Sequence, residues 1–360
     1  MQTTLAALLL HPKAVFRFEL GLGKRDDHGR VRLAPGELAY AIAYAVTDRV
    51  PDEELLKAAR DGSLESGDGI RKQVIRLIDA EQVKMQESYR SNKIGPRHTA
   101  PMLRFFQEYF GYTKAPQVFK DIATKRKARL AGNYSPDALV SDTNLLVLHF
   151  IDKDQDVLRE LLTTDRTFVS TGRGRWNGLV ELKRRAKKAG QTGKVTPFDD
   201  KRNRINEHYN ITPDQWTEDM PFPLDKTQRA GILTQPSWLI AHSTNFENHA
   251  IHRGKWIRER LLGGTIPNTP ITVDAQLPDD ETLTLRERMH VTREAFCWKC
   301  HQQMDPLGLS FEMYDHFGRF RTEELGKPVD TTGDVQFTGD PKIEGPVDGA
   351  VELFGRSEEH

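Results

Sequence analysis

The pentapeptide Cys297-Trp298-Lys299-Cys300-His301 contains both cysteines of this 360-residue chain. Two cysteines three residues apart, followed at once by histidine, form the C-x-x-C-H signature of c-type haem attachment. On a helical turn, positions i, i+3 and i+4 share one face, so both thiols and the imidazole would point the same way. The pattern therefore predicts haem c attached through Cys297 and Cys300, with His301 as the proximal ligand of its iron.

Three other interpretations of the cysteine pair stay open. A dithiol redox centre would require the βαβ pattern of a thioredoxin-like domain, which the flanking sequence lacks. A zinc site needs about four ligands, and no second C-x-x-C or H-x-x-x-H pattern supplies the others. Inert buried cysteines would explain the pair only by chance. Haem attachment is the interpretation that uses all three side chains of the motif.

The composition argues against several classes of partner. The chain has 52 Lys and Arg residues and 52 Asp and Glu residues, so its formal net charge is zero. No overall positive electrostatic field therefore favours binding to nucleic acid or to an anionic membrane. The basic run at residues 182–188 is more typical of a solvated helix face than of a nucleic-acid patch. No apolar stretch approaches the roughly 18 residues that a membrane span requires. We therefore expect no nucleic-acid partner and no membrane span.

Hydrophobic periodicity predicts a mainly α fold with irregular linkers, divided into four parts. Residues 1–165 show no sustained alternation of period two and are expected to form a helical domain. Residues 166–230 contain repeated glycine and proline and are expected to be an irregular connector. Residues 231–325 would form a helical haem-binding domain, and residues 326–360 the start of a C-terminal domain, with a short strand at 335–337.

The two ends of the chain bear on its location. Residues 5–10 are apolar but lack the basic n-region and small-residue cleavage site of a signal peptide, and they are more typical of a buried helix face. Covalent haem attachment nevertheless normally follows export. The apolar helix that begins at residue 350 also stops within a turn or two. We therefore expect a segment of a longer periplasmic or cell-envelope protein whose export signal lies upstream.

The second axial ligand of the iron is the least predictable part of the site. Met304 follows His301 by three residues on the same helical face, so it is not expected to reach the opposite side of the haem. Met313 is the candidate that we place first. A Met/His pair would favour electron transfer, whereas an open sixth position would permit small-ligand or peroxide chemistry. The other candidates are His316, Met289, His290, His242, His249 and His252.

Two further interactions are expected around the haem. Arg319 and Arg321 flank Phe320, and arginine binds carboxylates through bidentate charge-assisted bonds, so one of them is predicted to hold a haem propionate. A solvated arginine is the alternative. A ligating imidazole usually donates its other N–H to a carbonyl or a carboxylate, and we expect a backbone carbonyl of the Asp305-Pro306 turn to accept from His301.

Longer strings resemble a family of haem-motif proteins that is abundant in planctomycete-type bacteria and combines cytochrome c-like domains with domains of unknown function. The strings are the segment from His11-Pro12 to Glu19, Gly36-Glu37-Leu38-Ala39, Pro51-Asp52-Glu53-Glu54-Leu55-Leu56, Thr164-Asp165-Arg166-Thr167-Phe168-Val169, Gly231-Ile232-Leu233-Thr234-Gln235, His252-Arg253-Gly254-Lys255-Trp256, Leu285-Arg286-Glu287-Arg288, and a block from Cys297 through Arg321 that includes Met304-Asp305-Pro306-Leu307-Gly308. The resemblance thins between residues 170 and 230. It implies a longer exported protein but no particular reaction. Family members often carry a histidine a few residues before the haem motif, where this chain has Thr292, with His290 nearby.

Three functions are compatible with these observations. The first is single-electron transfer by a monohaem module within a larger exported protein, with an unidentified redox partner protein or domain. The second is a haem-dependent oxidoreductase acting on an extracellular carbon source, in which residues 1–165 supply a substrate or partner site. The third is a scaffold protein with a structural haem. No Ser–His–acid set or paired-carboxylate motif specifies a reaction, so enzymatic activity stays open.

Overall fold

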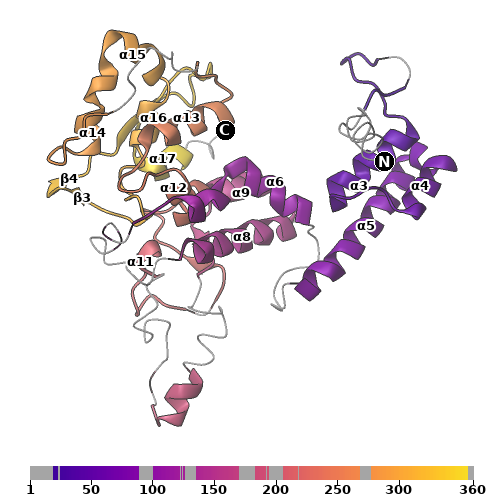
Figure 1. Ribbon diagram of the computed structural model, residues 1–360, viewed down its shortest axis with the longest axis horizontal. Helices are drawn as coiled ribbons and strands as arrows, with labels where there is room; N and C mark the ends of the chain where they lie inside the picture. The colour runs from indigo at the N-terminus through magenta and orange to yellow at the C-terminus, as the bar shows by residue number, and fades with distance from the viewer. Residues whose placement is uncertain are drawn as a thin grey trace, which may run out of the picture. The chain divides into compact units, whose positions relative to one another are not determined.

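The computed structural model describes residues 19–22, 25–88, 100–121, 123, 125, 135–169, 183–191, 193, 206–217, 219–267 and 277–355. The described residues are mainly helical with small two-stranded sheets, which confirms the predicted fold class (Figure 1). The chain divides into two compact units, Met1–Phe105 and Phe106–His360. The predicted helix at residues 5–10 lies outside the described residues.

The first unit is a small helical domain. Its elements are α3 (Pro35–Thr47), α4 (Glu53–Arg60), the 3₁₀ helix η1 (Ser63–Glu65) and α5 (Gly67–Ser88). Helix α4 begins where the sequence predicts, because the Asp52 side chain accepts a hydrogen bond of 2.9 Å from the amide of Leu55 and so caps an otherwise unsatisfied donor. The hydrophobic core of this unit consists of Ala39, Ile42, Ala43, Leu55, Ala58, Leu64 and Leu77.

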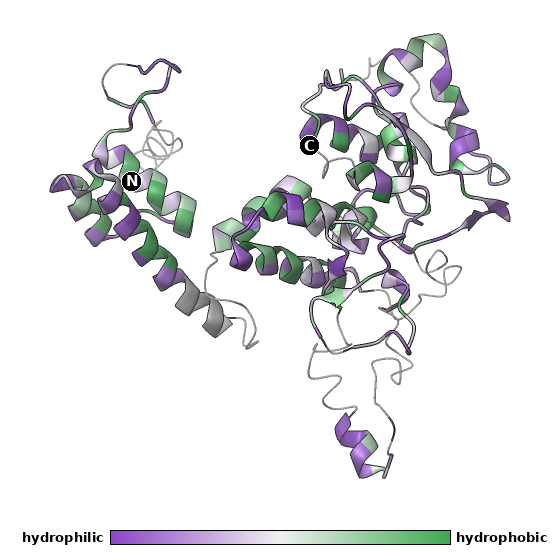
Figure 2. Ribbon diagram, turned by 180° about the vertical axis from the view of Figure 1, so that it is seen from behind, coloured by the Kyte–Doolittle hydropathy of each residue, from purple (hydrophilic) through white to green (hydrophobic). Residues whose placement is uncertain are grey.

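Helix α6 (Ala100–Phe110) contains the division between the units. The helices that follow are η2 (Tyr112–Gln117), α8 (Pro136–Lys153), α9 (Val157–Thr163), α11 (Asn206–Tyr209), η4 (Ile232–Thr234), α12 (Pro236–Ala241), α13 (Ala250–Arg260), α14 (Leu285–Arg288), η5 (Met289–Arg293), α15 (Ala295–His301), α16 (Asp305–Leu309) and α17 (Gly349–Gly355). Figure 2 shows hydrophobic and hydrophilic residues alternating around the helices of both units, as expected for helices that bury one face.

The strands of the second unit form three antiparallel pairs among the described residues. They are β1 (Arg166–Thr167) with β2 (Phe222–Pro223), β3 (Glu323–Glu324) with β4 (Lys327–Pro328), and β5 (Thr332–Val335) with β6 (Gly345–Asp348). Strand β5 ends at Val335, so the strand predicted at residues 335–337 begins and ends earlier than the sequence indicated. Residues 183–188 are helical with exposed basic side chains, as expected for a solvated helix face.

The described helices include none with the length and hydropathy of a membrane-spanning segment.

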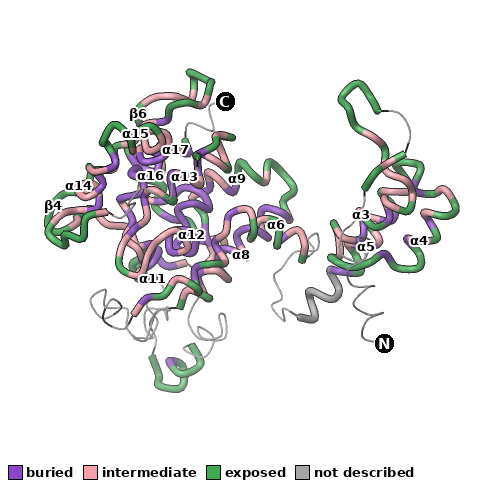
Figure 3. The backbone as a smooth tube through the Cα atoms, turned by 45° about the horizontal axis from the view of Figure 1, so that its top comes forward, coloured by how far each residue is buried: buried purple, intermediate pink, exposed green. Residues whose placement is uncertain are grey.

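The interior of the second unit is organised by a close crossing of α13 and α16. A Cβ atom on Gly254 would lie 1.8 Å from the carbonyl oxygen of Met304, and a Cβ atom on Gly308 would lie 1.8 Å from that of Ala250. Only glycine lets the two backbones approach this closely. Figure 3 shows the buried backbone concentrated around α12, α13 and α16. The crossing therefore fixes α16 against α13, and with it the segment that follows the C-x-x-C-H motif.

Three fully buried arginines, Arg229, Arg253 and Arg258, connect segments that are distant in the sequence. A buried guanidinium is costly unless it is hydrogen-bonded, and each of these donates to main-chain carbonyls. The accepting carbonyls are those of His208 and Gly318 for Arg229, of Leu239 and Phe311 for Arg253, and of Gln303 and Gln336 for Arg258. Arg253 belongs to one of the strings that resemble the haem-motif family, and Arg229 and Arg258 each lie two residues from such a string, so those strings contribute to the framework of the unit.

Candidate functional site

The C-x-x-C-H motif lies on α15, which follows a well-defined helix start. Thr284 and Glu287 form a capping box at the beginning of α14, where the side chain of each accepts a backbone N–H of the other. The chain continues through η5 into α15, which carries Cys297, Cys300 and His301 at helical spacing. Both cysteines are free and partly exposed. The thiols and the imidazole are therefore presented by one short helix, as the spacing predicts.

Helix α15 buries none of its own residues. Phe296, next to the first cysteine, is 60% exposed, and Trp298 is half-buried. An apolar side chain at the surface is common, but a whole helix without a buried residue is unusual in a packed domain. The described residues therefore leave the surface of α15 largely uncovered.

The imidazole of His301 is held by a carboxylate. Its Nδ1 lies 2.9 Å from Oδ1 and 3.1 Å from Oδ2 of Asp305, the first residue of α16. Asp305 Oδ2 also accepts a hydrogen bond of 2.6 Å from Thr292 Oγ1, on η5. Our expectation of a backbone carbonyl as the acceptor was wrong, because the turn after α15 directs the side chain of Asp305, and not its main chain, towards the imidazole.

Interactions on the far side of the turn keep Asp305 in place. Arg258 Nε donates to the carbonyl of Gln303 at 2.8 Å, within the turn that joins α15 to α16. The next residue, Met304, is buried, and its carbonyl lies at the crossing of α13 and α16. The carboxylate of Asp305 is only 3% exposed, against 21% for the His301 side chain. The arrangement thus buries the acceptor and leaves the imidazole partly accessible.

The structure places two of the candidate distal ligands beside one cavity. His249 and Met289 both line a cavity of about 370 Å³ whose wall includes Leu277 and Leu285. His249 stacks on His252 with the ring centroids 3.5 Å apart, and burial, reinforced by His252, lowers the pKa of His249 to about 3. His249 is therefore a neutral imidazole at ordinary pH, which is the form that binds metals.

The remaining distal candidates differ in surroundings. Met313 is half-buried, and its thioether packs 3.4 Å from the position that a Cβ atom would occupy on Gly349. His316 Nε2 is buried, and no hydrogen-bond partner for it exists among the described residues. His242 stacks on Trp238 and shares a hydrogen bond with its carbonyl, whereas His290 is exposed. None of these positions overturns the choice of Met313, which stays a prediction.

The two arginines expected at the propionates both contact carboxylates of the protein. Arg319 binds Asp315 Oδ2 through Nε and Nη2, each at 2.7 Å. Arg321 Nη2 lies 2.7 Å from Oε2 of Glu312. Burial raises the pKa of Glu312, and the positive charge of Arg321 opposes that shift. Each ion pair joins residues of the block that follows the motif. The propionate role of Arg319 and Arg321 stays a prediction beside these structural contacts.

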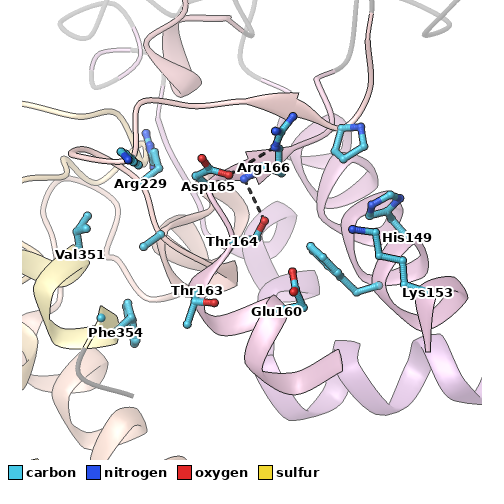
Figure 4. Close-up of a pocket in the computed structure, with 15 residues that line it drawn as sticks. His149, Lys153, Glu160, Thr163, Thr164, Asp165, Arg166, Arg229, Val351 and Phe354 are labelled. Carbon is cyan, nitrogen blue, oxygen red and sulfur yellow. Dashed lines mark hydrogen bonds and ion pairs between the residues drawn. The ribbon is translucent and has the colours of Figure 1, made fainter. Parts of the chain in front are cut away.

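A second, more polar cavity of about 660 Å³ lies between α8, α9 and α17 (Figure 4). Figure 4 shows His149 and Lys153 on one side and Val351 and Phe354 on the other, with Glu160 between them. Further polar lining comes from Thr163, Thr164, Asp165, Arg166, Lys226 and Arg229. The sequence does not reveal this cavity, because its walls come from three stretches that are far apart in the chain, 149–166, 221–230 and 351–355, and share no motif.

Comparison with protein-family models gives two matches. Residues 229–324 match PSCyt3, described as a protein of unknown function (DUF1588), and residues 33–91 match PSD4, described as a protein of unknown function (DUF1592). The first match contains α12 to α16 and the whole C-x-x-C-H motif; the second contains α3 to α5. They confirm the resemblance drawn from the motif strings to planctomycete-type cytochrome-like domains of unknown function. No curated protein and no solved structure matches the chain.

Proposed function

We propose that the cytochrome-like domain at residues 229–324 carries haem c on Cys297 and Cys300, with His301 as axial ligand, and passes single electrons. The observation that carries the proposal is the joint presentation of two free thiols and an oriented imidazole by α15. Nδ1–H of His301 donates a hydrogen bond to Asp305, which fixes the tautomer and leaves the lone pair of Nε2 for iron.

The donor set fits this group. Each thioether forms when a cysteine S–H adds across a vinyl double bond, so attachment consumes both free thiols and needs no oxidant. The apolar porphyrin would cover the exposed face of α15 around Phe296, and each apolar Å² removed from water contributes about 25 cal/mol. Bound haem supplies a one-electron Fe(III)/Fe(II) couple, and the residues of the chain position it and set its potential.

The location and the partner follow from the same chemistry. Because haem is normally attached to C-x-x-C-H after export, we place this domain in the periplasm or cell envelope, within a longer exported protein. Electron transfer also requires a donor and an acceptor, so the proposal includes a redox partner protein or domain. The short exposed helix α15 is the surface nearest the attached group from which such a partner would exchange electrons.

Covalent attachment is tested by co-expressing the chain with a haem c maturation system and extracting it with acid–acetone. Haem should remain with the wild-type polypeptide and raise its mass by one haem. The double variant Cys297→Ala/Cys300→Ala should release all pigment, while Lys299→Ala, on the exposed side of the same helix, should keep it. A colourless wild-type protein, or equal pigment in the double variant, would overturn the proposal.

The polar cavity favours a second candidate function, a haem-dependent oxidoreductase acting on a small extracellular carbon compound. Hydroxyl groups, two carboxylates and several cationic side chains line the cavity, as expected for a site that holds a polar substrate. The two functions predict different iron coordination. A low-spin, six-coordinate iron that does not bind carbon monoxide supports electron transfer, and a high-spin iron that binds carbon monoxide supports the oxidoreductase.

A further inference from the structure

Three side chains from three elements form a continuous hydrogen-bonded chain behind the motif. Thr292 on η5 donates to Asp305 on α16, and Asp305 accepts from His301 on α15. A carboxylate can only accept hydrogen bonds, so both neighbours are donors. The hydroxyl proton of Thr292 is shared with the carbonyl of Met289, which lies 2.8 Å away.

We propose that Asp305 sets the reduction potential of the iron bound by His301, and that Thr292 moderates this effect. The proposal rests on the haem attachment proposed above. The negatively charged carboxylate that accepts from Nδ1–H draws the imidazole towards imidazolate, which makes Nε2 a stronger electron donor. A stronger donor stabilises ferric over ferrous iron and lowers the potential. Asp305 is a positioning residue, because it acts through His301.

The effect is strong here because the carboxylate is buried and has few competing partners. Asp305 is 2% exposed, and among the described residues it forms no ion pair with lysine or arginine. Removing a charge from water is costly unless hydrogen bonds replace the lost hydration. His301 and Thr292 are the side chains that do so, and the imidazole N–H therefore experiences most of the charge.

Thr292 has the opposite influence. Its hydrogen bond withdraws electron density from Asp305 Oδ2, which reduces the pull of the carboxylate on the imidazole. Thr292→Val keeps the shape of the side chain and removes the hydroxyl. The carboxylate should then act more strongly on His301. Asp305→Asn and Thr292→Val are thus expected to shift the potential in opposite directions, although both break the same chain of hydrogen bonds.

The test is a potentiometric titration of the haem-loaded full chain. Substituting a residue that hydrogen-bonds to a metal-bound histidine typically changes metal affinity or activity by about 10–100-fold. Asp305→Asn should therefore raise the ferrous-to-ferric ratio at fixed potential by about tenfold. Thr292→Val should lower that ratio by about threefold, a smaller change than that of Asp305→Asn because the hydroxyl acts on His301 only through Asp305. Ser310→Ala, which removes the Ser310 Oγ bond to Leu307 within the α16 region, should leave the ratio unchanged.

The outcomes separate this proposal from the one on which it depends. Loss of covalent haem from the wild-type chain would refute the attachment itself. A wild-type chain that keeps its haem, with variants whose potentials coincide or move in the same direction, would refute the role of Asp305 and Thr292. If Asp305→Asn does not load haem, the isosteric Thr292→Val variant still decides the matter, because a purely structural role predicts no decrease in potential.

Discussion

Replacing Gly254 by alanine should disrupt the second unit at the crossing of α13 and α16. The added Cβ would lie 1.8 Å from the carbonyl oxygen of Met304 and 2.9 Å from the amide nitrogen of Gly308. Ordinary contact begins at about 3.4 Å, and both neighbours are backbone atoms, so α16 must move by more than an ångström. Overpacking a core costs about 1–3 kcal/mol, and a backbone clash belongs at the upper end of that range, so we expect the free energy of unfolding to fall by about 3 kcal/mol.

Urea unfolding followed by tryptophan fluorescence measures this loss, because all five tryptophans, the buried Trp238 among them, belong to the second unit. Gly36→Ala is the matched control, since Gly36 lies within α3 and a Cβ there meets nothing within 4 Å. Alanine is the better helix former, so the control should not weaken the first unit, and the tryptophan-reported unfolding of the second unit should match the wild type. A Gly254→Ala chain that unfolds at the wild-type urea concentration would refute the role of Gly254 in the close crossing of α13 and α16.

The same substitution should also affect the proposed haem site, since moving α16 moves Asp305 away from His301. Gly308→Ala creates its clash on the other side of the same crossing, 1.8 Å from the carbonyl oxygen of Ala250. Two changes that force the same helices apart should not add, so the double variant should lose clearly less than the sum of the single losses. Additive losses would mean that the two glycines act at independent contacts.

Two further predictions concern buried cations and buried imidazoles. Arg253→Lys should lower the free energy of unfolding by about 3 kcal/mol, measured by urea unfolding, because one ammonium cannot reach the separate carbonyls that the guanidinium bonds; the exposed Arg30→Lys should change little. The pKa of His242 is lowered by burial from 6.5 to about 4, so between these pH values the unfolded chain binds a proton that the folded chain does not. Stability should therefore fall as the pH falls from 6.5 to 4, and His242→Phe should flatten that slope while His290→Ala, at an exposed site, should not.

Part of the site was readable from the sequence because it depends only on local geometry. The i, i+3, i+4 spacing placed Cys297, Cys300 and His301 on one helix, and α15 follows that spacing. Asp305 lies four residues after His301, a spacing that also signals contact. We assigned its carbonyl and not its carboxylate, because a helix that ends at His301 does not reveal which group of the next turn faces back.

Other contacts could not be predicted, because they depend on how distant segments pack. Thr292 reaches Asp305 only because η5 and α16 are brought together, and a threonine in that place carries no signal of its own. Arg253 was part of a family-like string, but nothing in the sequence shows that its guanidinium is buried against main-chain carbonyls. Arg319 could have been anticipated to pair with Asp315, which precedes it by four residues.

The stability of α15 must therefore come from its neighbours and from what it binds. A seven-residue helix is too short to persist alone, and this one buries no residue of its own. Its C-terminal end is fixed through His301 to Asp305, and Asp305 is fixed by the packing of α16 against Gly254 of α13. The glycine crossing thus orients the imidazole from behind, while an attached haem would cover the exposed apolar face in front. The same residues that hold the helix in place are those that tune its ligand, so stability and potential should change together when α16 is displaced and separately when only the Thr292 hydroxyl is removed.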